Sequence, residues 1–308
     1  GRVTPSGLSS EKVKVGIILN PIAGAENGVR TRARVALAKD VFRQCNVDGE
    51  VFITTHRHHA RQLCLHCVER GAETIVAWGG DGTVNEVASE LVFRKSVFGL
   101  VPGGSGNGLA RELGLPRRDP KQALVIALQG GSRWIDVGEL GGRLFFNVAG
   151  IGLDAHLAGI FNASLSRGVR RYVISAAREL WHYTPKHYVI ETGQSSVSKT
   201  ALIVALANTR QYGANVQIAP LARPDDGVLE LVVVPSMPLV TTLRCAPRLL
   251  TGTIHRVPGV VMRSIRSLDI SSETPHAFHV DGEVYRGADK LTAKVYPRAL
   301  QIRCAAAP

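Results

Sequence analysis

The stretch Gly79-Gly80-Asp81-Gly82-Thr83-Val84-Asn85-Glu86 decides the fold of the N-terminal half of the chain. It follows the apolar run 74–78, which predicts a buried parallel strand, and it leads into a helical repeat of apolar residues from Val84 to Val92. Three glycines therefore turn a strand directly into a helix. Glycine lets a ligand approach the backbone closely, and a helix N-terminus offers unpaired N–H groups to phosphate. The stretch predicts a phosphate-binding loop.

The acid in this loop, Asp81, is unusual at a phosphate site. Its carboxylate would repel phosphate unless a magnesium ion offset the charge, or it could orient or deprotonate an attacking hydroxyl. The simpler alternative is a tight turn in an α/β protein, but a plain turn needs neither three glycines nor a buried acid.

Other strands of the N-terminal half also end in loops that could contact a ligand. Residues 13–19 predict a strand that ends at Asn20, and 51–55 predict a second that ends at Thr54 or Thr55. The strand 97–101 runs into Pro102-Gly103-Gly104-Ser105-Gly106-Asn107-Gly108 and then a helix over 109–113. Because ligands of open parallel sheets bind at the carboxyl ends of strands, we expect both glycine loops to face one crevice. A simple turn at Asn20 is an equally good interpretation of that residue.

Composition narrows the classes of protein and of partner. The chain has 308 residues with 45% hydrophobic and 20% charged residues, which is typical of a globular protein large enough for two domains. The net charge of +12 favours an anionic partner such as a nucleotide or an acidic membrane surface. Five cysteines without framework spacing favour a reduced, cytoplasmic chain, and no apolar run approaches the length of a membrane helix. No nucleic-acid partner is expected, because aromatic residues are only 6% and no such motif is present.

A cluster of histidines around Cys64-x-x-Cys67 suggests a zinc site at first sight. The two cysteines follow helical spacing with Ala60, Leu63 and Val68, which places them on a buried face, and no second cysteine pair completes a structural site. We therefore interpret both as core residues.

From about residue 134 the pattern changes to short alternating strands, which predicts a β-sandwich as the second domain. A helical insert over 155–183 interrupts it and carries Arg167, Arg170, Arg171 and Arg178 beside three aromatic residues. This insert could face a membrane or simply cap the sandwich. The expected strands are 134–140, 143–148, 187–191, 201–207, 228–234, 267–271, 276–280 and 290–296.

Taken together, the motifs resemble the diacylglycerol kinase catalytic-domain family, the bacterial lipid kinases related to sphingosine and ceramide kinases. The resemblance extends over nearly the whole chain in the family's order. The matching stretches are Asn20-Pro21-x-x-Gly24, Gly79–Glu86, Pro102–Asn107, Gly150-Ile151-Gly152-Leu153-Asp154-Ala155, Asn208 with Tyr212-Gly213, Ala219-Pro220, Asp226-Gly227 and His279-Val280-Asp281-Gly282-Glu283. Two positions depart from the pattern: Ala23 replaces a common serine, and Asn107 is followed by glycine.

The resemblance implies an α/β N-terminal domain similar to NAD kinases and phosphofructokinases, with a parallel sheet and a glycine-rich Asp loop, followed by a C-terminal β-sandwich. We expect the domains at 12–133 and 134–308, with the extreme C-terminus able to return to the first. The implied activity is ATP-dependent phosphorylation of a lipid hydroxyl, of diacylglycerol or sphingoid type, at an anionic membrane that the cytoplasmic enzyme contacts peripherally. A homodimer is compatible with the sequence.

The resemblance also assigns site residues. Glu283 aligns with the family's proposed proton acceptor, and Asp81 and Asp281 are rivals for that role. Asp154 would lie near the lipid head group. Asp226, with the carbonyls of Arg223 and Val228, falls at a magnesium site, although Pro224-Asp225-Asp226-Gly227 also reads as an ordinary β-turn. ATP contacts are implied at Asn20, Pro21, Gly24, Thr55, Gly79, Gly80, Asp81, Gly82, Thr83, Asn85, Gly104 and Ser105.

Two other classes of function remain open at this level. A NAD kinase explains Gly79–Thr83 equally well but explains Pro102–Asn107 and His279–Glu283 poorly. A non-catalytic nucleotide or lipid sensor would not need to retain Asp81, Asp281 and Glu283.

Overall fold

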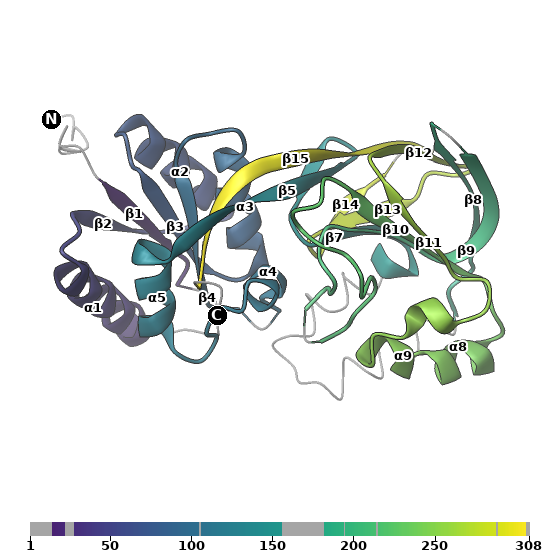
Figure 1. Cartoon of the computed structure of the whole chain (residues 1–308), viewed down its shortest axis with the longest axis horizontal. Helices are drawn as coiled ribbons and strands as arrows, with labels where there is room; N and C mark the ends of the chain where they lie inside the picture. Colours follow the sequence, from purple (N-terminus) through teal and green to yellow (C-terminus); the bar gives the residue numbers. More distant parts are fainter. Residues whose placement is uncertain are drawn as a thin grey trace, which may run out of the picture.

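A computed structural model of the chain describes residues 14–21, 28–104, 106–155, 182–193, 195–213, 215–287 and 289–305. Its N-terminal half is built on a parallel sheet in the order β4-β3-β1-β2 (Figure 1). The two central strands are buried along their whole length, which explains why their sequences are continuous apolar runs. The strands are β1 (Val15–Leu19), β2 (Gly49–Ile53), β3 (Thr74–Gly79) and β4 (Val97–Pro102).

Helices cover both faces of this sheet. On one face α1 (Gly28–Cys45) and α5 (Pro120–Gln129) pack through Phe42 and Leu124. On the other face α2 (His59–Glu69) and α3 (Asp81–Leu91) pack through Cys64 and other apolar residues. A short helix, α4 (Gly108–Glu112), follows the second glycine loop. The N-terminal domain is therefore a three-layer α/β fold, as predicted.

The C-terminal half is a sandwich-like arrangement of mostly antiparallel strands around a second apolar core. Two helices, α8 (Leu239–Cys245) and α9 (Pro247–Leu250), and a 3-10 turn, η1 (Ile254–Arg256), project from it. The strands are β5 (Gly131–Leu140), β6 (Arg143–Phe145), β7 (Val148–Gly152), β8 (Lys186–Thr192), β9 (Ser195–Ala207), β10 (Leu229–Pro235), β11 (Val261–Ile265), β12 (Ser267–Ser272), β13 (Ala277–Val280), β14 (Glu283–Arg286) and β15 (Lys290–Cys304).

Two long strands connect the halves. β5 and β15 pair antiparallel from the sandwich to the first sheet, where Ile302 of β15 pairs in parallel with Phe98 of β4 (Figure 1). Because β5 is continuous across residues 133 and 134, no loop marks the boundary that we expect there. The exact division of the chain at that point stays a prediction.

The structure corrects several sequence-based expectations. The single strand expected over 143–148 is two strands, β6 and β7, separated by Phe146 and Asn147. The turn after the expected strand 276–280 is formed by Asp281 and Gly282, and Glu283 opens a further strand, β14. Four features were not predicted from the sequence: α5, the α8–α9 pair, β11 and β14. Most of the helical insert expected over 155–183 lies outside the described residues.

The candidate zinc cysteines belong to the core. Cys64 and Cys67 are both fully buried and unpaired, and burial raises the pKa of the Cys67 thiol to about 12. Among the described residues, no group of three or more His, Cys, Asp or Glu side chains is arranged to hold a metal ion. In the same ranges, no helix combines the length and hydropathy needed to cross a bilayer.

Candidate active site

The two glycine loops touch each other at the carboxyl edge of the parallel sheet. The N–H of Gly103 donates to the carbonyl of Gly79 over 2.8 Å. A Cβ added to Gly104 would lie 2.8 Å from the Cα of Gly80, so a side chain at Gly104 would push the loops apart. On its outer side the first loop is open, because a Cβ at Gly82 would meet nothing within 4 Å. The glycines thus allow close backbone packing inside and ligand access outside.

Asp81 ties the loops together. Its carboxylate accepts the N–H groups of Asn107 and Gly108, each over 3.0 Å, and a Cβ on Gly106 would clash with it. Burial raises the pKa of Asp81 to about 6; the bond from Gly108 opposes that rise, and the negative charge of Asp281 adds to it. The acid is thus engaged by the second loop, and its charge is offset by two backbone dipoles.

The remaining described phosphate-loop residues surround the start of α3. Asn20, directly after β1 and before Pro21, donates through Nδ2 to Thr83 Oγ1 over 2.8 Å. Within the part of the chain that the structure describes, no side chain caps the N-terminus of α3 at Gly80, so first-turn N–H groups face the site where an anion could bind. Thr55 is exposed after β2, and its N–H donates to His59 Nδ1 over 3.0 Å. Two further candidates, Gly24 and Ser105, lie outside the described residues.

Asp281 lies in the two-residue turn between β13 and β14. Asp281 and Gly282 have φ values of 48° and 87°, as a type I′ hairpin requires. The Asp281 carboxylate accepts Asn85 Nδ2 over 2.9 Å and the N–H groups of Phe146 and Asn147 over 2.9 and 2.8 Å. Removal from water raises the pKa of Asp281, whereas these three donors oppose the rise. Asp281 therefore fastens the hairpin to α3 and to the break between β6 and β7.

Glu283 has a different environment from the other two acids. Its side chain is 30% exposed, and Oε1 lies 2.5 Å from Arg57 Nη2, in the loop that leads into α2. Burial and a hydrogen bond with Glu283 raise the pKa of the neighbouring Tyr285 to about 12. Of the three candidate bases, Glu283 is the one whose described partners are side chains, not backbone N–H groups.

Asp154 forms a buried cluster with Tyr212 and His279. The Tyr212 hydroxyl donates to Asp154 Oδ2 over 2.8 Å, and His279 Nε2 lies 2.9 Å from the same oxygen. The N–H of Gly282 donates to His279 Nδ1 over 3.3 Å, which fixes the other edge of the ring beside Asp154. The sequence motifs contain Tyr212 and His279, but no local pattern indicates that they meet Asp154.

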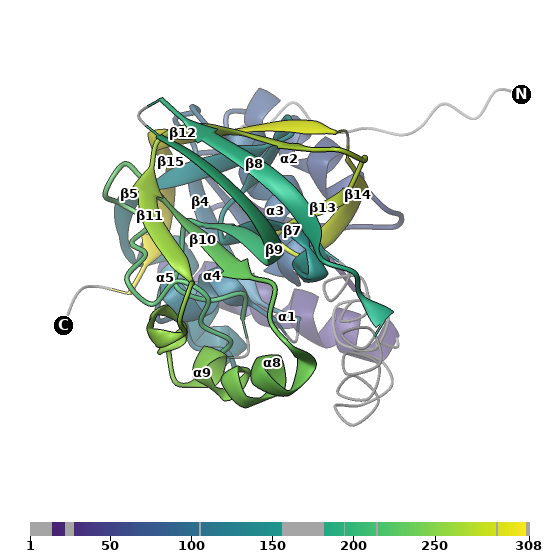
Figure 2. The ribbon, with the colours of Figure 1, turned by 90° about the vertical axis from the view of Figure 1, so that its right-hand side faces the viewer.

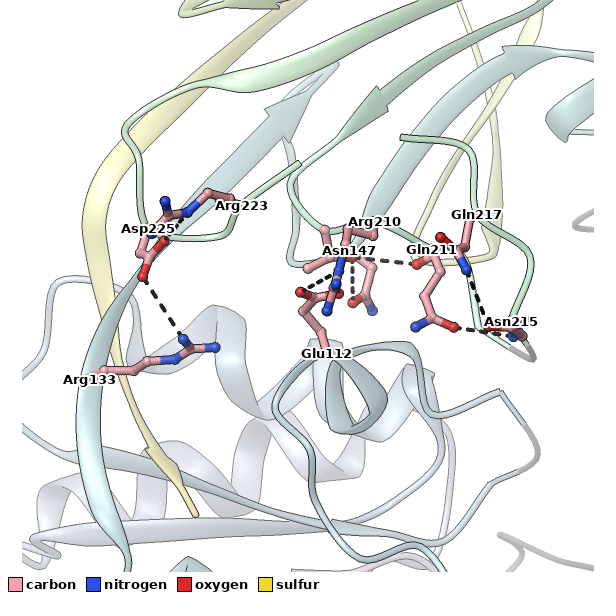
Figure 3. A network of polar contacts seen from close by, with 10 residues as sticks. Glu112, Arg133, Asn147, Arg210, Gln211, Asn215, Gln217, Arg223 and Asp225 are labelled. Atoms are coloured by element: carbon pink, nitrogen blue, oxygen red, sulfur yellow. Dashed lines mark hydrogen bonds and ion pairs between the residues drawn. The ribbon is translucent and has the colours of Figure 1, made fainter. Parts of the chain in front are cut away.

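The expected metal residues form a turn on the rim of the sandwich. Asp226 is exposed and accepts the N–H of Val228 over 3.2 Å, while Asp225 lies near Arg133 and Arg223 (Figure 3). The turn is held from inside by Asp136, a fully buried acid that accepts the N–H groups of Gly227 and Arg298. Asp136 was missed by sequence reasoning because it occupies one position in an otherwise ordinary strand pattern.

A further contact joins the domains beside the second glycine loop. Glu112 of α4 pairs with Arg210, whose Nε lies 3.2 and 3.3 Å from its two carboxylate oxygens (Figure 3). Two residues later, the carbonyl of Tyr212 would lie 2.8 Å from a Cβ on Gly108. The loop after β9 therefore packs directly on the second glycine loop, whose N–H groups donate to Asp81.

Comparisons with known proteins agree with this architecture. The chain matches the family model described as the diacylglycerol kinase catalytic domain over residues 14–140. It matches the model described as the YegS C-terminal NAD kinase beta sandwich-like domain over residues 147–304.

Individual relatives extend the match along the chain. A protein of Chromohalobacter salexigens named as a probable YegS-like lipid kinase is 33% identical over 257 residues, 80% of each chain. A diacylglycerol kinase of Mycobacterium tuberculosis is 29% identical over 303 residues, 94% of each. The crystal structure of a diacylglycerol kinase from Bacillus anthracis aligns with a TM-score of 0.71 at 19% identity, covering 95% of this chain and 97% of that one. With its parallel α/β domain, its facing glycine loops and its sandwich, the chain belongs to the diacylglycerol kinase catalytic-domain family.

Proposed function

We propose that the protein transfers the γ-phosphoryl group of ATP to a hydroxyl group of a lipid. The observation that carries this proposal is that the two glycine loops and the hairpin bearing Glu283 converge on one edge of the parallel sheet, joined through Asn85 and Asp281. The names of the relatives, diacylglycerol kinase and lipid kinase, support the same reaction.

The chain offers suitable groups for binding the triphosphate. The uncapped start of α3 supplies N–H groups and the positive end of a helix dipole, and the open space over Gly82 admits phosphate close to the backbone. Asp81 keeps the second loop against the first, and Asn20 fixes the hydroxyl of Thr83. These residues would position the phosphates.

Glu283 is the best-suited base among the three acids. In the proposed step the lipid oxygen attacks the γ-phosphorus, its proton passes to the Glu283 carboxylate, and the bond between the γ-phosphorus and the bridging oxygen breaks to release ADP. Asp81 and Asp281 are held by backbone N–H groups, whereas Glu283 needs only to exchange Arg57 for the substrate hydroxyl. We propose positioning roles for Asp81 and Asp281.

Magnesium is the ion that such a transfer requires, since it neutralises charge on the phosphate oxygens. The turn at Asp226 contains the types of donor that a hard cation prefers, a carboxylate and backbone carbonyls, and the carbonyls of Arg223 and Val228 are the ligands that we propose beside Asp226. We propose this turn as a magnesium site that supports the structure of the rim.

On the lipid side, we propose that Asp154 accepts a hydrogen bond from the substrate head group. Tyr212 and His279 both contact Oδ2 of Asp154, so within the described ranges Oδ1 is the oxygen that we assign to the substrate. A polar acceptor held rigidly in an apolar surround suits a lipid with a free hydroxyl. The enzyme would take this lipid from the surface of a membrane.

The test is transfer of labelled phosphate from ATP with magnesium to diacylglycerol, sphingosine and a total lipid extract in mixed micelles, with products identified by mass spectrometry. We expect one phosphorylated lipid, and we expect Glu283→Gln to reduce kcat at least a hundredfold. The exposed Glu273 on the same domain supplies the matched control, Glu273→Gln, with full activity expected.

Other outcomes would redirect the assignment. Phosphorylated NAD in a parallel reaction, without a lipid product, would make the protein a NAD kinase. ATP binding without transfer to any acceptor would favour a sensor. Full activity in a correctly folded Glu283→Gln variant would remove Glu283 from the role of base.

A further inference from the structure

The α8–α9 segment projects from the sandwich (Figures 1 and 2). It carries exposed apolar side chains. Neither helix has a buried residue. Val240 is 60% exposed, Leu243 is 50% exposed and Leu250 is 56% exposed. Val240, Leu243 and Arg244 are three and four residues apart, so they share one side of α8. An unpartnered apolar side on a projecting helix indicates a binding surface.

The segment is firmly attached on its inner side. Leu249 and Met237 pack against an apolar cluster that includes Ile218 and Ala219 of the preceding loop. Leu249 and Leu250 are neighbours in sequence, yet the first is partly buried in this cluster and the second is exposed. The outward apolar residues are therefore presented on an anchored scaffold.

The loop beside α9 extends the same surface. The N–H of Gln217 donates to the carbonyl of Leu249 over 2.7 Å, and a Cβ on Gly252 would lie 3.7 Å from the ring of Pro220. The next residue, Leu221, is 75% exposed. In the described part of the chain nine large apolar side chains are exposed, and four of them lie on this one projection.

The charged side chains of this stretch of sequence have one sign. The sequence contains no Asp or Glu from 231 to 268, whereas this stretch contains five arginines. Arg244 lies in the last turn of α8, Arg248 lies in α9, and exposed Arg256 follows in η1. Apolar side chains flanked by arginines match the layered structure of an anionic bilayer, where acyl chains lie beneath negative head groups. A protein partner would need an acidic surface of the same shape.

The chain that follows β9 connects this surface to the candidate active site. The loop that carries Leu221 begins after β9, where Arg210 pairs with Glu112 (Figure 3). A Cβ on Gly213 would lie 3.1 Å from the carbonyl of Gly106 in the second glycine loop. Contact of α8 and α9 with a bilayer would therefore bring the bilayer near the loop that contacts Asp81.

We propose that Leu221, Val240, Leu243, Arg244, Arg248 and Leu250, the α8–α9 surface, dock the protein on an anionic lipid bilayer. The apolar residues insert among the acyl chains and the arginines contact the head groups. The inference rests on the proposed function in one respect: the docked bilayer is also the source of the substrate.

The test is sedimentation of the protein with vesicles of phosphatidylglycerol and phosphatidylcholine, without ATP. We expect Leu243→Asn with Leu250→Asn to lower the partition coefficient at least tenfold, because two exposed leucines no longer enter the bilayer. We expect Arg244→Gln with Arg248→Gln to lower it on the order of tenfold on these vesicles and to have little effect on phosphatidylcholine alone. Circular dichroism and gel filtration verify the fold of each variant.

The matched control lies on α1, which also has an exposed apolar residue among basic ones. Val29→Asn with Arg32→Gln and Lys39→Gln removes similar groups from the first domain and should bind vesicles like the unaltered protein. An equal loss in this control, or unchanged binding of the α8–α9 variants, would overturn the proposal. So would conversion of a dimer to a monomer by Leu243→Asn, which would make the surface an interface between two copies.

Kinase activity on a short-chain lipid in detergent separates this inference from the proposed function. The α8–α9 variants should retain that activity and lose activity on vesicles. Binding that depends on the surface, without any lipid phosphorylation, would support docking and refute the lipid kinase. Lipid phosphorylation with full vesicle binding in the variants would refute the docking surface alone.

Discussion

Replacing Asp81 with asparagine should change how the stability of the protein depends on pH. Burial raises the pKa of Asp81 from 3.8 to about 6 in the folded protein. The folded state therefore binds the proton more tightly than the unfolded chain. Asp81 contributes stability in its protonated form at low pH, and this contribution is lost as the pH rises through about 6. At neutral pH the buried charge is a net cost to folding.

The size of the effect follows from the two pKa values. The full displacement corresponds to roughly 3 kcal/mol, because each pKa unit is worth about 1.4 kcal/mol. Between pH 7.5 and pH 4.5 the Asp81 contribution to the free energy of unfolding should rise by about 2 kcal/mol. Asp81→Asn also loses one acceptor for the N–H of Asn107 or Gly108. That second loss is nearly independent of pH, so the pH dependence isolates the titration.

The assay is urea unfolding of the unaltered protein and of Asp81→Asn at both pH values. The difference in their free energies of unfolding should shift by about 2 kcal/mol in favour of the unaltered protein at the lower pH. The raised pKa of Asp281 is common to both proteins, so the comparison reports the titration of Asp81 together with its charge coupling to Asp281. Asp48→Asn, at an exposed acid, is the control substitution. The same pH dependence in Asp81→Asn and in the unaltered protein would refute a buried, titrating Asp81.

Two other predictions concern the contacts around the loops. Gly106→Ala should destabilise the protein by about 1–3 kcal/mol and weaken ATP binding measured by calorimetry, because the new Cβ clashes with the Asp81 carboxylate. The control is Gly131→Ala, where a Cβ meets nothing within 4 Å. Equal stability and ATP binding of the two variants would contradict the prediction. Arg57→Gln should reduce stability by less than about 1 kcal/mol in thermal unfolding, since its pair with Glu283 is largely exposed. A loss several times larger, insensitive to salt, would mean that this ion pair holds the domains together.

The parallel sheet and its glycine loops were predictable because their determinants are local. A continuous apolar run specifies a buried strand, and the glycines after β3 and β4 specify tight turns toward a helix. The core role of Cys64 and Cys67 was likewise predictable from helical spacing, and both are fully buried.

The contacts that assemble the site were not predictable, because they join residues far apart in sequence. Asn85 and Asp281 are 196 positions apart, and Arg57 and Glu283 are 226 apart. No local pattern distinguishes an acid that fastens a hairpin from one that faces a substrate. The break between β6 and β7 was missed because its hydrogen-bond partner is also distant in sequence: the N–H groups of Phe146 and Asn147 both donate to Asp281.

The helices α8 and α9 were missed because neither contains a fully buried residue, and only Leu249 packs against an apolar cluster. Helix prediction from sequence depends on an apolar stripe that faces a core, with polar residues opposite it. In 239–250 apolar residues and arginines are mixed around short helices, so the pattern gives no single inward face.

The shared strand β15 has a mechanical consequence. Any movement that opens or closes the space between the halves must bend the β5–β15 ribbon, because these two paired strands connect the halves. The ribbon has a weak point where its register shifts between Tyr296 and Leu300, and Arg298 adopts a φ of 50° there. The N–H of Arg298 donates to buried Asp136, which also accepts the N–H of Gly227 in the rim turn. A single buried carboxylate thus braces the connection between the two halves at the point where its strand pairing is interrupted.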